Sequence, residues 1–214
     1  MLNFAKTFSR YETLVSEVDK IFNAMQEAHK DCVRCKTYCC DCCYAVFDVT
    51  LMESFYINYH FNNALTRRER RAIVKRAERA DRQYYQIKQK LQKMYIHQGR
   101  SPEDVLSHLA EERVRCPLLN DKKLCDLYQW RPITCRVYGL PTSIGGVTHI
   151  CRDSGFKEGT AYPTVNLDNM NDRLFQLSEE LLREMGSTRS KIHLSLVPVS
   201  AALMTTYDEK YFLV

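Results

Sequence analysis

The chain is poor in the residues that interrupt helices and lacks the long apolar runs that cross membranes. Of its 214 residues, seven are glycine and six are proline, which leaves little room for long linkers and favours helices. No stretch of about 18 consecutive apolar residues occurs, so we expect no membrane span. Residues 1–10 carry no apolar run typical of a secretory signal, so we expect a cytoplasmic protein.

Several motifs of catalysis and nucleotide binding are also missing. The sequence contains no Gly-rich phosphate loop, no G-x-G-x-x-G fingerprint and no recognisable Ser-His-Asp order. A Rossmann-type methyltransferase domain is therefore not supported. The sequence assigns no catalytic residue.

The apolar positions repeat every three or four residues over much of the chain, which is typical of amphipathic helices. This spacing predicts a first helix from about residue 11 and further helices at 66–98 and 168–185. Residues 51–64 are rich in aromatics and predict a buried helix, with a strand as the alternative. Ser-Pro-Glu-Asp at 101–104 is typical of a helix start and predicts a helix at 101–114. Residues 192–199 fit a short strand or an extended tail. We therefore expect a mainly α fold, a compact helical domain spanning 1–214. Its parts would be a helical portion at 1–115, a turn-containing, Cys-rich metal-binding segment at 116–156, and a C-terminal helix and tail at 157–214.

Ten cysteines form two separated groups. Disulfides are rare in a reducing cytosol, so such groups indicate metal ligation there, with structural disulfides or redox thiols as alternatives. Adjacent cysteines also count against a disulfide framework, because they sit closer than the usual Cα separation of a bridge. The first group is Cys32, Cys35, Cys39, Cys40, Cys42 and Cys43; the second is Cys116, Cys125, Cys135 and Cys151.

The first group continues the helical spacing of the segment before it. At about 100° per residue, Cys32, Cys35, Cys39 and Cys42 would fall within roughly 80° of one another on a helix. One interpretation is a packed core face, since free cysteine is often buried. The other is a first helix that brings its inner face to a metal. Five thiols on one face, counting Cys43, favour the metal.

The second group lies in a block of ordered motifs. Cys-Pro-Leu-Leu at 116–119 precedes Cys-Asp-Leu-Tyr at 125–128 and Arg-Pro-Ile-Thr-Cys-Arg-Val-Tyr at 131–138. Together with the upstream cysteines, this order resembles the YkgJ-type cysteine-cluster family, described as zinc- or iron-chelating domains and related to the cysteine-rich part of flagellin lysine N-methylases. The resemblance covers about residues 32–151 and is most specific at 116–138.

The family pattern is a cysteine, two residues, a second cysteine, two residues and an adjacent cysteine pair. Cys39, Cys42 and Cys43 fit its last three positions, and Cys35 stands one residue early. A register that begins at Cys32 and contains one insertion is a close alternative. The first register leaves Cys32 and Cys40 outside the set. With it, the resemblance implies eight candidate ligands, which are Cys35, Cys39, Cys42, Cys43, Cys116, Cys125, Cys135 and Cys151.

Eight thiolates are too many for one tetrahedral zinc ion. They suit two zinc sites, one iron–sulfur cluster with thiols to spare, or a larger cluster, because four cysteines hold a 4Fe–4S cubane. The methylase relatives favour iron and sulfide, so we expect an iron–sulfur cluster, with zinc as the alternative. His29 and His149 could each replace a thiolate, although a surface imidazole is the simpler interpretation.

Two arginines flank Cys135. Four thiolates around zinc or an oxidised cubane leave a charge of about −2, which a guanidinium offsets while donating hydrogen bonds to sulfur. Arg131 and Arg136 are therefore the candidates for cofactor binding beside the ligands. The alternative is that both are ordinary surface arginines.

The predicted helix at 66–98 is strongly basic. Residues 66–100 contain twelve Lys or Arg and three acids. Such a stripe attracts an anionic partner, either nucleic acid or an acidic protein. The alternative is a solvated outer face.

Two functional hypotheses follow from these patterns. The first is an iron–sulfur protein with redox or protein-modifying chemistry, in which case a lysine methylase-like enzyme would have a protein substrate. The second is a non-catalytic zinc-binding module whose basic helix recruits an anionic partner.

Overall fold

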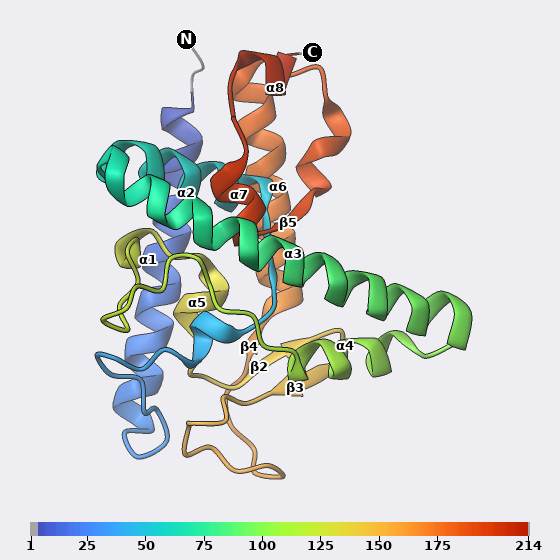
Figure 1. Cartoon of the computed structure of the whole chain (residues 1–214). Helices are drawn as coiled ribbons and strands as arrows, with labels where there is room; N and C mark the ends of the chain where they lie inside the picture. Colours follow the sequence, from blue (N-terminus) through green and yellow to red (C-terminus); the bar gives the residue numbers. More distant parts are fainter. Residues whose placement is uncertain (1–3, 214) are drawn as a thin grey trace.

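The structure is a computed structural model in which residues 4–213 are described (Figure 1). Helices account for most of these residues, which confirms the predicted mainly α fold. The α-helices are α1 Ala5–Ala28, α2 Leu51–Ala64, α3 Arg67–Gln98, α4 Pro102–Glu111, α5 Ile133–Val137, α6 Leu167–Met185, α7 Val199–Met204 and α8 Glu209–Leu213. The 3₁₀ turns are η1 Asp41–Tyr44, η2 Tyr128–Trp130 and η3 Ser190–Leu194.

Two small sheets tie distant parts of the chain together. The first pairs β1 with β5 in antiparallel fashion, with Val49 opposite Val197. In the second, β2 lies between β3, which is antiparallel to it, and β4, which is parallel. The strands are β1 Asp48–Thr50, β2 Thr142–Ile144, β3 Val147–His149, β4 Val165–Asn166 and β5 Leu196–Pro198.

The long middle helices begin and end at residues that the sequence marks. The side chains of Thr50 and Thr66 each accept a hydrogen bond from the backbone N–H three residues later. The carboxylates of Glu53 and Glu69 in turn accept from the backbone N–H of Thr50 and Thr66. This reciprocal capping box satisfies amide groups that the first helical turn leaves free. Gly99 ends α3 with φ 61°, a left-handed conformation that favours glycine. The helices predicted at 51–64, 66–98, 101–114 and 168–185 are thereby confirmed, the third one ending at Glu111.

The first helix ends earlier than predicted. It stops at Ala28, and residues 29–40 form turns in which Tyr38 has φ 71°, a value that no right-handed helix contains. The prediction of a shared helical face for the thiols was therefore wrong. A spacing of three and four residues also fits consecutive turns, such as the one closed by the Cys39 amide and the Lys36 carbonyl at 3.0 Å.

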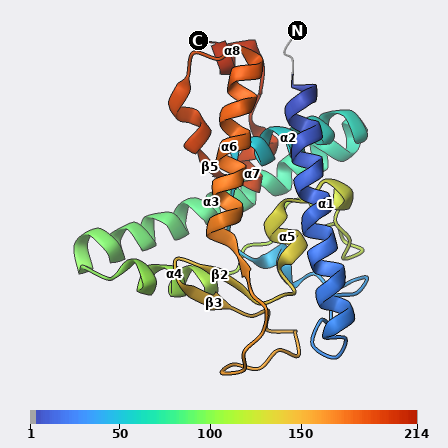
Figure 2. The same ribbon diagram turned by 180° about the vertical axis from the view of Figure 1, so that it is seen from behind.

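Most of the buried apolar residues belong to two cores. In the larger one α1 and α6 lie side by side (Figure 2), and α2 packs against α6. Val18, Met52 and Leu181 of this core are each 0% exposed. The smaller core joins α2, α3 and α7 and includes Ile57 and Leu127. The C-terminal half of α3 and the following α4 project from this body (Figures 1 and 2). None of the described helices is both long enough and apolar enough to span a membrane.

The C-terminal helix offers a test of the larger core. Phe212 is 0% exposed and its ring lies 5.5 Å from that of Phe55, whereas the neighbouring Leu213 is 41% exposed. We expect Phe212→Ala to lower the free energy of unfolding in urea by about 3–5 kcal/mol, because it opens a cavity. The control Leu213→Ala should change it by less than about 0.5 kcal/mol. Equal losses in the two variants would contradict this packing.

Candidate metal centre

The two cysteine segments meet along a short stretch of paired backbone. The Cys116 amide donates to the Cys43 carbonyl at 2.7 Å, and the Val114 amide donates to the Tyr44 carbonyl at 3.0 Å. Ala45 and Arg113 form an antiparallel bridge next to these bonds. Residues 43–45 and 113–116 therefore lie side by side, although they are far apart in the sequence. This pairing sets η1, which carries Cys42 and Cys43, beside the start of the second segment.

Five thiols from both segments share one neighbourhood: Cys42, Cys43, Cys116, Cys125 and Cys135. Burial raises the pKa of Cys116 to about 12, and the nearby Cys125 is the next cause. Burial also raises the pKa of Cys125 to about 11 and that of Cys135 well above its usual range. Cys42 is close enough to add to the rise in pKa of each of the other four. The early and late cysteines thus converge.

Cys42 and Cys43 are adjacent, and each thiol is the main influence on the pKa of the other. Cys43 lowers the pKa of Cys42, and Cys42 raises that of Cys43. The Arg131 guanidinium also lowers the pKa of Cys42. Cys42 is consequently the member of the pair that ionises first.

Three further predicted ligands adjoin this group. Burial raises the pKa of Cys35 to about 11, and Cys39, Cys151 and Cys42 add to the rise. The Cys35 sulfur also approaches Gly139 closely, since a Cβ built on Gly139 would lie 2.2 Å from it. Only glycine leaves room for the sulfur there. Cys35, Cys39 and Cys151 therefore lie next to the five-thiol group, with Cys42 between the two sets.

The two cysteines left outside the predicted ligand set have other surroundings. The Cys32 side chain packs against the larger core, and its carbonyl accepts from the Gly155 amide at 2.8 Å. Cys40 precedes η1, and its carbonyl accepts from the Cys43 amide at 3.0 Å. Of the two candidate histidines, His29 lies against the rings of Phe156 and Tyr162, and His149 ends β3.

The five cysteines lie at the border of the smaller core. Cys116 and Cys125 pack against it, while Leu118 and Leu127 belong to it and are 2% and 0% exposed. Each of the five residues is half-buried as a whole, whereas burial is the largest cause of the raised pKa of the Cys116, Cys125 and Cys135 thiols. Their sulfur atoms are therefore turned away from water, as both a core side chain and a ligand of an enclosed metal require.

Asp41 joins the two segments through its side chain, a role that the sequence analysis missed. One carboxylate oxygen accepts from the Tyr138 hydroxyl at 3.1 Å and from the Cys151 thiol at 3.7 Å. The other oxygen pairs with Arg113, whose guanidinium lies 5.6 Å from the centre of the Tyr44 ring. An acid enclosed by cysteines at 39–43 was the signal that could have identified it.

The two predicted arginines have different surroundings. Arg131 acts on the thiols, since it lowers the pKa of Cys42 and works against the rise in pKa of Cys35 and Cys125. Its guanidinium lies 4.0 Å from the centre of the Tyr128 ring. It is therefore the cation next to the sulfur atoms.

Arg136 is 6% exposed and is held by Asp19 of α1 at 2.8 Å. It also donates to the carbonyl oxygens of Arg131 at 3.1 Å and Gln129 at 2.5 Å. These bonds fix α5, and with it Cys135, against α1. A hydrogen bond from Arg136 to sulfur stays a prediction.

Glu53 also holds α5, the helix that carries Cys135. The side chain is 4% exposed, and one carboxylate oxygen accepts from the amide of Ile133, the first residue of α5, at 2.9 Å. The other oxygen lies 3.4 Å from the Thr50 amide. Burial raises the pKa of the Glu53 carboxyl. The bond to Thr50 is local to the start of α2, whereas the bond to Ile133 depends on tertiary structure.

The thiols are neighbours without forming a ready-made ligand set. Within residues 4–213, no three Cys, His, Asp or Glu side chains are grouped as ligands of one ion. Rotation about χ1 moves a cysteine sulfur without moving the backbone. Because thiolates select zinc, copper(I) and iron–sulfur clusters, the donor atoms fit a soft metal chemically.

Comparisons with protein-family models, curated proteins and solved structures gave no match to this chain. The resemblance to the YkgJ-type family stays a prediction from the cysteine spacing and the motifs at 116–138.

The Glu53 carboxyl can be tested apart from any metal. We expect Glu53→Ala to lower the free energy of unfolding by about 1–3 kcal/mol, because the buried Ile133 amide loses its acceptor. Glu53→Gln keeps an acceptor oxygen and removes the buried charge, so it should lose less. Urea unfolding of both variants provides the measurement. A glutamine variant as unstable as the alanine variant would show that the bond to Ile133 does not carry the effect.

Proposed function

We propose that the two cysteine segments bind a metal centre through thiolates in the cytoplasm, with an iron–sulfur cluster as the first choice and zinc as the alternative. The observation that supports this most is the convergence of five half-buried thiols from segments far apart in the sequence. Burial raises the pKa of the free thiols of Cys116, Cys125 and Cys135. Binding a soft metal would give these sulfur atoms a partner that takes them as thiolates.

The ligands would come mainly from the five-thiol group of Cys42, Cys43, Cys116, Cys125 and Cys135. Cys42, which neighbours each of the other four, would be a ligand in every arrangement, and three of the others would complete one cubane cluster or one all-cysteine zinc site. Cys35, Cys39 and Cys151 lie beside Cys42 and supply three more thiols. They would serve either a second zinc ion or a cluster that uses thiols from both sets.

Arg131 and Asp41 would adjust the charge around such a centre. Four thiolates leave a net charge of about −2 on zinc or an oxidised cubane, and a nearby guanidinium reduces the cost of holding it. Asp41 keeps Cys151 and Tyr138 together and is itself paired with Arg113. A bound iron–sulfur cluster would supply one-electron transfer, whereas zinc would cross-link the two segments.

Metal content of matched cysteine variants tests the proposal. Cys42 lies between the two sets of thiols, whereas Cys32 packs against the apolar core. We expect Cys42→Ser to lose most of the bound metal and Cys32→Ser to retain it, since serine replaces a soft donor with a hard one. Iron, acid-labile sulfide and zinc would be measured in anaerobically purified protein. Full metal content in Cys42→Ser, or none in the unmodified protein, would reject the proposed centre.

The identity of the metal determines which form of the proposal holds. Iron and sulfide in equal amounts, with visible absorption that bleaches on reduction, would establish a cluster. Zinc alone in both aerobic and anaerobic preparations would exclude the iron–sulfur cluster and leave the zinc form of the proposal.

Removing the metal should also destabilise the fold around it. A chelator is expected to lower the melting temperature, because binding free energy contributes to folding free energy at such sites. The effect should disappear in Cys42→Ser, which would already lack the metal. Chelation that destabilises Cys42→Ser as strongly as the unmodified protein would locate the chelated metal elsewhere.

A further inference from the structure

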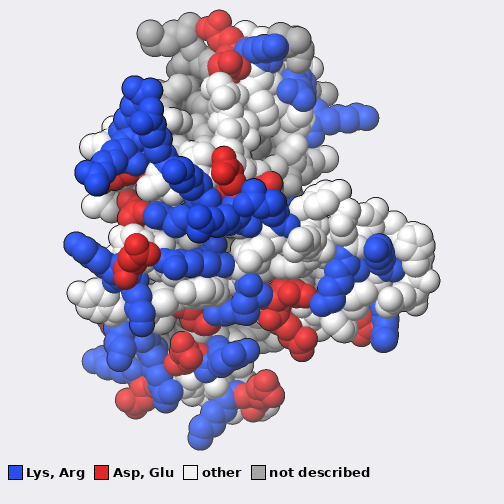
Figure 3. All heavy atoms as spheres, in the orientation of Figure 1, with Lys and Arg blue, Asp and Glu red and all other residues white. Residues whose placement is uncertain are grey.

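One face of α3 carries a row of cations, which we call the cationic stripe and define as Arg68, Arg71, Lys75, Arg79 and Arg82. At about 100° per residue these five positions fall within roughly 80° of one another. All five side chains are exposed. The space-filling view shows a basic band over α3 (Figure 3). The stripe lies on the N-terminal half of the helix, before the projecting arm.

The stripe has no acidic counterpart in the part of the chain that the structure describes. Other cations of α3 are paired: Arg76 with Asp126 at 2.8 Å, and Lys88 with Asp48 at 2.8 Å. The five stripe residues form no ion pair within residues 4–213. Glu78, an exposed acid at the edge of this face, is likewise without an ion-pair partner there.

The clustering works against helix stability. Like charges four residues apart repel each other, and Arg71, Lys75 and Arg79 repeat at this spacing. A solvent-exposed helix face needs polar residues, but charges of alternating sign would stabilise the helix more than charges of one sign. Repulsion within the stripe therefore destabilises α3, and, among the residues that the structure describes, no ion pair of the stripe compensates for it.

We infer that the cationic stripe binds the phosphate backbone of a nucleic acid. Four of its five residues are arginine, whose planar guanidinium donates two parallel hydrogen bonds to phosphate. From Arg68 to Arg82 the helix extends about 21 Å at 1.5 Å per residue, the length of about six phosphate steps of a duplex strand. An extended polyanion can contact all five side chains at once.

An aromatic side chain adjoins the end of the stripe. Tyr85 follows Arg82 by three residues and is 63% exposed, while its hydroxyl accepts from the Gln89 amide at 2.9 Å. An exposed ring of this kind can stack on a base. An acidic polypeptide would use the cations but gives no reason for the exposed ring. Tyr85 therefore favours a single-stranded nucleic acid over an acidic protein.

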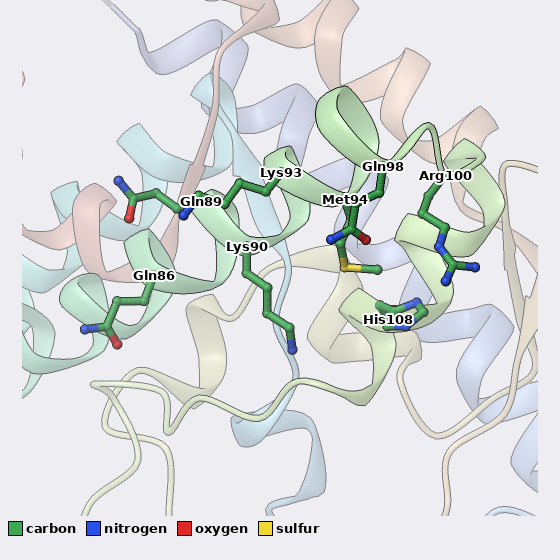
Figure 4. A pocket seen from close by; sticks show the side chains of 8 residues that line it. All are labelled: Gln86, Gln89, Lys90, Lys93, Met94, Gln98, Arg100 and His108. Atoms are coloured by element: carbon green, nitrogen blue, oxygen red, sulfur yellow. The ribbon is translucent and has the colours of Figure 1, made fainter.

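Polar side chains continue the track along α3. Gln86, Gln89 and Lys93 follow on nearly the same face and line an open groove between the end of α3 and α4 (Figure 4). Amide and ammonium groups commonly contact phosphate and sugar oxygens. The contact surface therefore extends from the stripe onto the projecting arm.

Binding of a labelled single-stranded RNA of mixed sequence tests the inference. The stripe variant combines Arg71→Gln, Lys75→Gln and Arg79→Gln. The control combines Lys20→Gln, Lys157→Gln and Arg183→Gln, which removes the same number of exposed charges elsewhere. Fluorescence anisotropy would be measured at about 50 and 200 mM salt, because phosphate contacts make affinity depend on salt. Circular dichroism would verify that both variants fold.

The unmodified protein should bind the RNA, and the stripe variant should bind at least about tenfold more weakly with a salt slope lower by about 2. The control variant should bind within about twofold of the unmodified protein. Tyr85→Ala should weaken binding about fivefold or more without changing the salt slope.

Three results would overturn the inference. One is no binding by the unmodified protein. Another is equal weakening in the stripe and control variants, which would reflect net charge alone. The third is preference for polyglutamate over RNA and over duplex DNA, which would identify an acidic protein as the partner.

Discussion

The backbone pairing between residues 43–45 and 113–116 is the constraint on which the candidate centre depends. The amide of Cys116 and the carbonyl of Cys43 are 2.7 Å apart, so the two cysteine segments are fixed at their closest point by main-chain atoms rather than by flexible side chains. Sulfur atoms can then rotate within a fixed frame. Glu53 and Arg136 add to this frame, since both hold α5, the short helix that carries Cys135.

Much of the helical fold could be predicted from the sequence. Helices α3, α4 and α6 combine a three-and-four apolar repeat with capping residues, whereas α2 is marked by its run of apolar and aromatic residues, and each of these signals is local. The end of α1 could not be predicted in this way, because cysteine fits an apolar repeat as well as a turn. Only the turn geometry at 29–40 separates the two possibilities.

The candidate site could be predicted in part. The sequence motifs identified the eight cysteines, but not their division into a five-thiol group and an adjoining three. That division depends on η1 and on the backbone pairing, which are tertiary features. Asp41 and Tyr138 were missed for the same reason, because their hydrogen bond connects residues from two distant parts of the chain.

Helix α3 connects the two proposed activities. Arg76 holds the second cysteine segment through Asp126 and the Pro117 carbonyl at 2.7 Å, whereas the centre of the cationic stripe lies about 100° further around the helix. One helix therefore supports the thiol site on one side and exposes a basic surface on another.

Metal K-edge X-ray absorption of the purified protein tests the central claim most directly, because it reports the atoms bound to the metal. A centre built by both segments predicts a first shell of sulfur only, at about 2.3 Å for zinc. Replacing Cys42 alone, or Cys116, Cys125 and Cys135 together, by serine should in each case disturb that same shell. A first shell of nitrogen and oxygen, or a spectrum that only one of the two replacements changes, would contradict convergence of the two segments on one metal centre.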